Sequence, residues 1–208
     1  MRFETFLVIV LTAMLVFAIS CISPSASVNE IGPSDPSIPE GETPEYLTAF
    51  QNAQAEVESG NYAAAATRFA EAYEIARTDV EKEKCSVAVV ANLLRIPGVS
   101  TNDPQIKQWL DKAQMHAAKS EELPELKVLK SFVDLSNGKL TTDISGVPIY
   151  SSNILSISAG ELYAYQALVA FLSGDRTTAA EKLNSALSVE PTNPVVTKIA
   201  ATLRSLGL

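Results

Sequence analysis

Histidine is almost absent from this chain, and its scarcity limits the chemistry that the protein could perform. The 208 residues include one histidine, His116, and two cysteines, Cys21 and Cys85. One imidazole cannot build a histidine-based metal cluster or a Ser-His-Asp constellation with a spare base. A glycine-rich phosphate loop is also missing, and adjacent acids such as Glu121 and Glu122 are typical of solvated helix faces. We therefore expect no enzymatic activity, no metal site and no cofactor.

Positive charge is also scarce. The chain has 16 Lys and Arg against 24 Asp and Glu, a net charge of −8 and an isoelectric point near 4.7. Affinity for nucleic acid comes largely from Lys and Arg that neutralise phosphates, so a nucleic-acid partner is not expected. Acidity mainly indicates solubility, and a basic partner is the alternative. Nothing in the sequence indicates a small-molecule substrate.

No hydrophobic run in the sequence has the length of a comfortable membrane span. The longest, Phe6–Ile19, is 14 residues with Thr12 as its one polar member, whereas a spanning helix needs about 20. An export signal fits this length better. We predict that residues 1–20 are a signal peptide, and an uncleaved membrane anchor is the alternative.

A cysteine follows this run at a place suited to processing. Ala18 and Ser20 supply small residues at positions −3 and −1 before Cys21. The arrangement resembles the lipobox of prokaryotic lipoproteins, although that family prefers Leu where Ala18 stands. The resemblance implies that Cys21 is lipidated and begins the mature chain, and cleavage without lipid is the alternative. The protein is then expected to be exported and membrane-anchored in the cell envelope, or otherwise secreted.

The segment 21–43 has the composition of a tether. Pro24, Pro33, Pro36 and Pro39 stand among Ser, Gly and acidic residues. Such a segment cannot build a core and should stay extended and solvated. Residues 44–208 are therefore expected to form the folded domain, connected to the membrane by this tether.

The clearest structural pattern in the domain runs from Ser158 to Pro194. Ser158 and Glu161 form a capping box at a helix start, and a turn is expected at Ser173-Gly174-Asp175, followed by a second helix. The first of these helices is apolar nearly all round and must be covered on most sides. A helical hairpin of this kind needs neighbours that stack on it, so further copies are expected.

This hairpin resembles a tetratricopeptide repeat (TPR). The anchor positions of that 34-residue pattern fall on Tyr163, Ala167, Ala170, Ala179, Leu183 and Pro191. The match is good in the second helix and looser in the first, where Gln166, Ala167 and Ala170 replace the family's Leu, Gly and Tyr. The resemblance implies a scaffold that binds a protein or peptide partner.

A second copy of the hairpin is recognisable near the start of the domain. Ser59-Gly60-Asn61 repeats the turn, and Ala65, Phe69 and Ala72 keep the spacing of Ala179, Leu183 and Ala186. Two further turns are expected between the copies, one at Gly138 and one in the loop 97–102. We therefore predict an all-α, TPR-like solenoid of about four hairpins plus a C-terminal capping helix.

Caps and prolines set the expected bounds of the remaining helices. These helices are Pro44–Glu58, Tyr62–Arg77, one that opens at a second capping box formed by Thr78 and Glu81 and ends before Pro97, one from Pro104 to residue 119, Leu123–Leu135, and one from Pro194 to Leu206. Residues 139–157 favour an extended or irregular segment with a short helix at 151–157. This segment departs from the family pattern, and an insertion that reaches over the groove is one interpretation of it.

Several single residues are expected to have structural roles. Cys85, Trp109 and Tyr163 should be packing residues. His116 should lie at the surface near a helix C-terminus, where a partial positive charge is favourable.

In TPR proteins the free face of the first helices lines a concave groove that binds the partner. Carried over to this chain, that face comprises Phe50, Gln54, Val57, Ala164, Leu168, Phe171 and Leu172. Phe171 and Leu172 are the sharper candidates, and burial against residues 139–157 is their alternative. We expect a non-enzymatic scaffold in envelope assembly; the alternative is a structural spacer or surface accessory whose groove is filled by its own segment.

Overall fold

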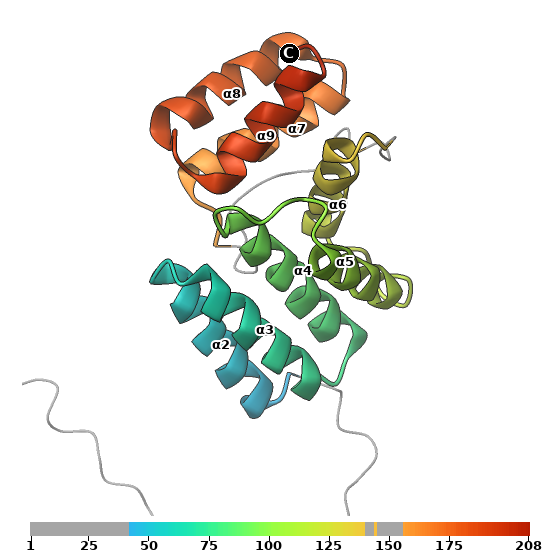
Figure 1. Ribbon diagram of the computed structural model, residues 1–208. Helices are drawn as coiled ribbons and strands as arrows, with labels where there is room; N and C mark the ends of the chain where they lie inside the picture. Colours follow the sequence, from blue (N-terminus) through green and yellow to red (C-terminus); the bar gives the residue numbers. More distant parts are fainter. Residues whose placement is uncertain (1–41, 140–143, 145–155) are drawn as a thin grey trace, which may run out of the picture. The chain divides into compact units, whose positions relative to one another are not determined.

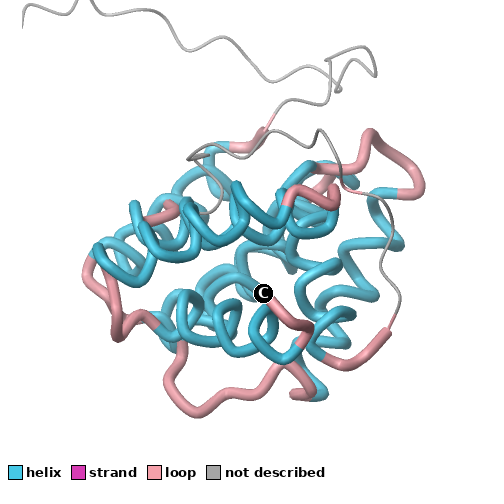
Figure 2. Tube along the Cα trace, turned by 90° about the horizontal axis from the view of Figure 1, so that it is seen from above, coloured by secondary structure: helices cyan, strands magenta, loops and turns pink. Residues whose placement is uncertain are grey.

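Prolines and polar caps divide the folded domain into helices. The computed structural model describes residues 42–139, 144 and 156–208, and within these ranges every regular element is a helix (Figure 1; Figure 2). The described helices are α2 (Pro44–Glu58), α3 (Tyr62–Ile75), α4 (Asp79–Arg95), α5 (Pro104–Ala117), α6 (Pro124–Ser136), α7 (Ala159–Leu172), α8 (Arg176–Val189) and α9 (Pro194–Ser205). The predicted all-α fold is confirmed.

Both predicted capping boxes are present. The hydroxyl oxygens of Thr78 and Ser158 accept hydrogen bonds from the N–H of Glu81 at 3.1 Å and of Glu161 at 3.2 Å. Helix α6 has no such residue, because its N-cap is Leu123. The carboxylate of Glu83, from α4, accepts from the Leu123 N–H at 2.8 Å instead. A tertiary contact thus supplies the cap that the local sequence lacks.

Helix α3 ends earlier than the sequence indicates. It was expected to reach Arg77, but it ends at Ile75 and Ala76 is extended. The N–H groups of Arg77 and Thr78 both donate to the carboxylate of Glu81, at 2.7 and 2.9 Å. The capping box of α4 therefore takes the backbone groups that would have continued α3. At the C-terminus, Leu206 is the cap of α9 and not its last helical residue.

The four expected turns all lie where the sequence places them. Gly60, Gly98, Gly138 and Gly174 have φ angles of 75°, 82°, 70° and 83°, and they follow α2, α4, α6 and α7. Glycine adopts this left-handed conformation at little cost, which ends a helix and reverses the chain. Most of the helix predicted at 151–157 falls outside the described residues.

Adjacent helices pack against each other, as in a helical repeat. Helices α2, α3, α4 and α5 lie side by side in chain order, and α7 and α8 form a hairpin with α9 against α7 (Figure 1). Helix α4 also contacts α6 and α9. Its residues 85–95 are buried without exception. Because α9 is distant in sequence, the fold is closed more tightly than an array in which each repeat contacts only its neighbours.

The structural roles predicted for three side chains agree with their packing. Cys85 is fully buried against Tyr46, and burial raises the pKa of its thiol to about 12. The Trp109 ring meets Tyr73 edge-on with 5.3 Å between centroids, and the half-buried Tyr163 lies 5.4 Å from the ammonium of Lys182 on α8.

In the part of the chain that the structure describes, no helix combines the length and the apolar character that a membrane crossing requires.

Candidate binding groove between α5 and α6

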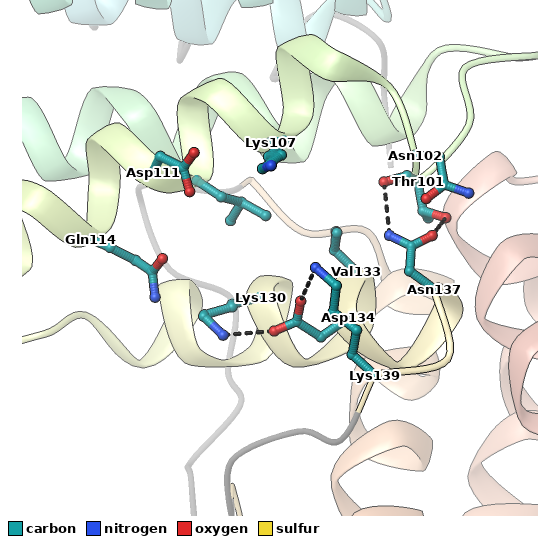
Figure 3. A pocket seen from close by; sticks show the side chains of 11 residues that line it. Thr101, Asn102, Lys107, Asp111, Gln114, Lys130, Val133, Asp134, Asn137 and Lys139 are labelled. Atoms are coloured by element: carbon teal, nitrogen blue, oxygen red, sulfur yellow. Dashed lines mark hydrogen bonds and ion pairs between the residues drawn. The ribbon is translucent and has the colours of Figure 1, made fainter.

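Helices α5 and α6 are neighbours in the chain, but they make only limited contact. Helix α5 packs extensively on α4 but makes few contacts with α6. The space between them is a cavity of about 360 Å³ (Figure 3). Its floor is apolar, because Leu110 from α5 and Val133 from α6 are 6% and 5% exposed. We call this cavity the α5–α6 groove.

The α5 wall of the groove carries a stripe of polar side chains. Lys107, Asp111 and Gln114 stand four and three residues apart, a spacing that places them on one helix face (Figure 3). Among the described residues, none of these three side chains has a hydrogen-bond or ion-pair partner. Their donors and acceptors remain available to a ligand.

The α6 wall differs, because its polar groups bind one another. The Asp134 carboxylate pairs with the ammonium of Lys130 at 2.6 Å and with that of Lys139 at 3.7 Å. At one end of the groove, the Asn137 amide donates to the carbonyl of Thr101 at 3.4 Å. Two lysines share one carboxylate, so this wall keeps an excess of positive charge.

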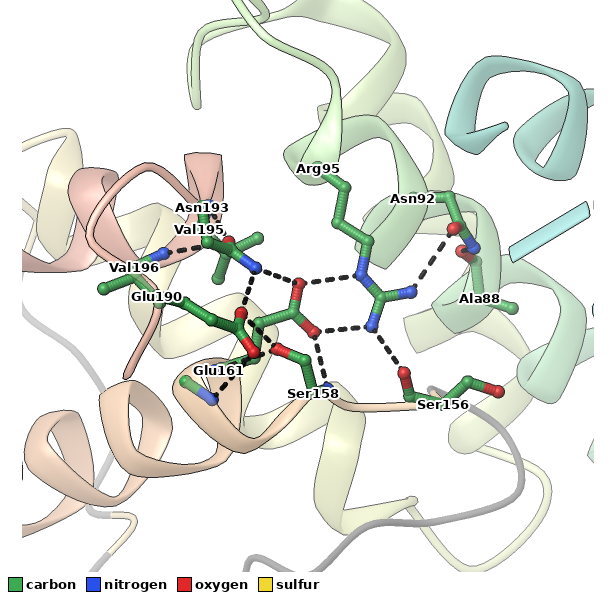
Figure 4. Close-up of polar contacts among 11 residues, drawn as sticks. Ala88, Asn92, Arg95, Ser156, Ser158, Glu161, Glu190, Asn193, Val195 and Val196 are labelled. Carbon is green, nitrogen blue, oxygen red and sulfur yellow. Dashed lines mark hydrogen bonds and ion pairs between the residues drawn. The ribbon is translucent and has the colours of Figure 1, made fainter. Parts of the chain in front are cut away.

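A second polar cluster, which we call the clasp, lies buried at the end of α4 (Figure 4). Arg95 donates from Nε and Nη2 to the two carboxylate oxygens of Glu161 on α7, at 2.9 and 2.7 Å. The side chains of this pair are only 4% and 2% exposed. Burial lowers the pKa of Arg95, but the hydrogen bonds and charge of Glu161 outweigh it and raise that pKa overall. Asn92 and the carbonyl of Ser156 accept from the rest of the guanidinium.

The clasp continues into the start of α7. The carboxylate of Glu190 accepts from the Ser158 hydroxyl at 2.7 Å, the Gly160 N–H at 3.3 Å and the Asn193 amide at 2.8 Å. A carboxylate is favourable there because it faces the positive end of a helix dipole. Lys198 of α9 also donates to the carbonyls of Leu94 and Ile96. These bonds hold α4, α7 and α9 together.

His116 departs from the sequence-based expectation. It lies near the C-terminus of α5 as predicted, but it is 4% exposed and not a surface residue. Its Nδ1 pairs with Asp79 at 2.6 Å and its Nε2 lies 2.9 Å from the Tyr73 hydroxyl. The hydrogen bond from His116, with help from Lys119, holds the pKa of Asp79 below its ordinary value. Burial raises the pKa of Tyr73 above its ordinary value.

The residues expected to line a concave face are distributed over two helices that do not pack closely on each other. Val57, Ala164 and Leu168 are buried in the core and offer a partner no surface. Phe50 is half-buried, with its ring 5.0 Å from that of Phe69. Of the rest, Gln54, Phe171 and Leu172 are also half-buried, and Arg176 lies over the Phe171 ring at 5.5 Å. A binding role for these partly exposed residues stays a prediction.

The groove residues have a weak signature in the sequence. Lys107, Asp111 and Gln114 show helical spacing over the apolar Leu110, but any solvated helix face shows the same pattern. The clasp has a partial signature. The sequence identifies Glu161 as a capping residue, but its pairing with Arg95, 66 positions earlier, depends on tertiary packing.

Comparisons with protein-family models, with curated proteins and with solved structures find no match to this chain. The TPR resemblance therefore rests on the residues quoted above and stays a prediction. Within the described ranges, no three His, Cys, Asp or Glu side chains gather in a way that could hold a metal ion.

Proposed function

We propose that this protein is a non-enzymatic scaffold of helical repeats that binds a segment of a partner protein in the α5–α6 groove. The observation that carries the proposal is the combination of an apolar floor with a polar wall whose side chains have no partners among the described residues. Binding sites in proteins typically combine apolar lining with a few polar groups that fix orientation. A groove of this kind suits a peptide segment.

The frame around the groove is well suited to hold its shape. Helix α5 packs extensively on α4, whose residues 85–95 are all buried. The start of α6 is fixed by Glu83, which accepts hydrogen bonds from Leu123 N–H and from the Ser120 hydroxyl at 3.0 Å. Sites mounted on rigid elements lose less conformational freedom on binding.

Photo-crosslinking in native membranes tests this proposal. A benzoylphenylalanine placed at Gln114, inside the groove, should give a discrete adduct with a partner. The same probe at Asn184, exposed on α8, serves as the matched control and should not give that adduct. The proposal is overturned if the groove probe gives no adduct, or gives the same adducts as the control.

The proposal includes export and attachment to a membrane at the N-terminus. It rests on the 14-residue apolar run Phe6–Ile19 and on Cys21, which lie outside the described residues. Lipidation of Cys21 and the tether 21–43 would place the helical domain near an envelope assembly. The intact mass of the protein purified from its native membrane tests this part. A chain that begins at Cys21 with added acyl mass is expected, and a full-length or unlipidated chain would contradict the lipid anchor.

A further inference from the structure

The α5–α6 groove adjoins a second hollow on α5. This second cavity, of about 430 Å³, is lined by Pro104, Gln108, Lys112 and Met115 together with Lys107 and Asp111. The last two residues also line the α5–α6 groove. The two cavities therefore adjoin at Lys107 and Asp111, and both follow the length of α5. An elongated ligand fits such a surface better than a compact one.

The charge of this surface is opposite to that of the whole chain. Its charged lining residues are Lys107, Lys112, Lys130 and Lys139 against Asp111 and Asp134. The chain as a whole carries a net charge of −8. Basic side chains are thus concentrated where the surface is hollow, and an acidic ligand is the electrostatic complement.

The lysines that line this surface differ in whether their ammonium groups already have partners. Lys107 has no partner among the described residues, whereas Lys130 is engaged with Asp134 at 2.6 Å. The Lys112 ammonium lies 3.8 Å from the centroid of Trp109 and 4.5 Å from that of Tyr73, so its stem is held in place. Lys107 is the cation that is most available for a new ion pair.

The remaining groups suit a peptide backbone and apolar side chains. Gln114 offers both a hydrogen-bond donor and an acceptor, as an extended backbone requires. Met115 is 51% exposed and can adapt to irregular apolar groups. The apolar floor at Leu110 and Val133 would receive side chains from an alternating acidic and apolar segment.

We infer that the surface formed by these two adjoining cavities along α5 binds an extended acidic peptide segment, in which carboxylates meet Lys107 and the Lys130–Lys139 wall. This inference rests on the proposed function and names the chemistry of its partner. It is distinct from the proposed function, since a groove that bound neutral or basic peptides would keep the scaffold role and lose the acidic one.

Fluorescence anisotropy with three labelled synthetic peptides tests the inference on the full chain. The peptides alternate Leu with Glu, with Gln or with Lys. The Glu peptide should bind about tenfold more tightly than the Gln peptide, with an advantage that shrinks as salt is raised. The Lys peptide should bind least. Equal affinity for the Glu and Gln peptides would overturn the inference.

Two charge-reversal variants locate the binding. Lys107→Glu should weaken the Glu peptide about tenfold and strengthen the Lys peptide. Its fold should survive, because an acidic residue is favourable near the N-terminus of α5. Arg204→Glu, exposed on α9, makes the same change in net charge and should alter neither affinity. Equal losses in the two variants would mean a nonspecific charge effect and would overturn the site.

Further outcomes separate the inference from the proposed function. Binding of the Gln or Lys peptide that competes with the Gln114 crosslink would keep the scaffold and reject the acidic partner. Displacement of the Glu peptide by free glutamate at equal concentration would indicate a small-anion site and overturn the peptide inference. Absence of all peptide binding together with absence of a groove crosslink would overturn both proposals.

Discussion

The clasp and the α5–α6 groove each gather charged and amide side chains between helices, but these groups are used in opposite ways. In the clasp, Glu161 accepts from both arms of Arg95 in a nearly dry environment. In the groove, Lys107, Asp111 and Gln114 reach no partner among the described residues. Polar groups that bind each other fix a structure, whereas polar groups that remain available over an apolar floor can bind something else.

This difference follows from how far each cluster is exposed to solvent. A buried charge must be paired and hydrogen-bonded, because its desolvation costs on the order of several kcal/mol. Lys107 and Asp111 are exposed, so water satisfies them until a ligand arrives. Removing one partner from the clasp should therefore cost much more stability than removing a side chain from the groove. Four predictions test this contrast, in order of decreasing effect.

The largest effect is expected for Glu161→Ala. The substitution leaves the guanidinium of Arg95 buried without its carboxylate and also removes a capping-box acceptor. The free energy of unfolding should fall by about 3–5 kcal/mol, as measured by urea denaturation followed by circular dichroism. The paired variant Arg95→Met with Glu161→Leu is the control, since it removes both charges and should be much closer to wild type. If Glu161→Ala were as stable as wild type, the clasp would not hold the helices together.

A smaller loss is expected for Gly160→Ala in the first turn of α7. A Cβ at this position would lie 2.6 Å from the Cβ of Glu190 and 2.9 Å from its carboxylate. Glu190 would have to move, and its bonds to Ser158 and the Gly160 N–H would weaken. We expect about 1–3 kcal/mol of destabilisation, measured by thermal and urea unfolding.

Thr177→Ala is the matched control for Gly160→Ala. Thr177 is exposed in the first turn of α8. The substitution adds no atom in a crowded place and should change stability by less than about 0.5 kcal/mol. An increase in stability on Gly160→Ala, as for an ordinary helical glycine, would show that the close approach to Glu190 is not a constraint.

The sequence predicts the fold well where local chemistry decides it. The capping boxes at Thr78 and Ser158 and the turn glycines Gly60 and Gly174 act within a few residues, and the structure has all of them. The end of α3 was missed because Glu81 reaches back over the chain to Arg77. Local patterns alone do not reveal such competition for backbone groups.

The sites are less predictable than the helices, because they depend on which helices meet. His116 was expected at the surface, but Asp79 and Tyr73 from other parts of the chain enclose it. The free face assumed for α7 contains Ala164 and Leu168, which are fully buried in a helix that packs mainly against α8 and α9. In a fold that closes on itself, helical periodicity identifies an apolar face without telling which neighbour covers it.

The ion pair of Asp79 and His116 is intermediate in burial between the clasp and the groove, because the Asp79 carboxylate is partly exposed. The folded-state pKa of Asp79 is lowered, so its stabilising effect is present above its unfolded pKa and is lost as pH falls through the folded value. At neutral pH, Asp79→Asn should be less stable than wild type, and the gap should narrow below about pH 4. Urea unfolding of both proteins between neutral pH and acidic pH measures this difference in stability. A gap that stayed constant with pH would contradict an ionised Asp79 as its source.

The smallest effect on stability is expected in the groove itself. The fold depends little on Lys107, Asp111 and Gln114, since their side chains have no hydrogen-bond or ion-pair partners among the described residues. Alanine is also at least as good a helix former as any of them. Each substitution to alanine should therefore change the free energy of unfolding by no more than about 0.5 kcal/mol, while Lys107→Ala weakens capture of the Glu peptide. A large loss of stability from any of the three would mean that the side chain serves the fold, and the contrast between groove and clasp would then fail on the groove side.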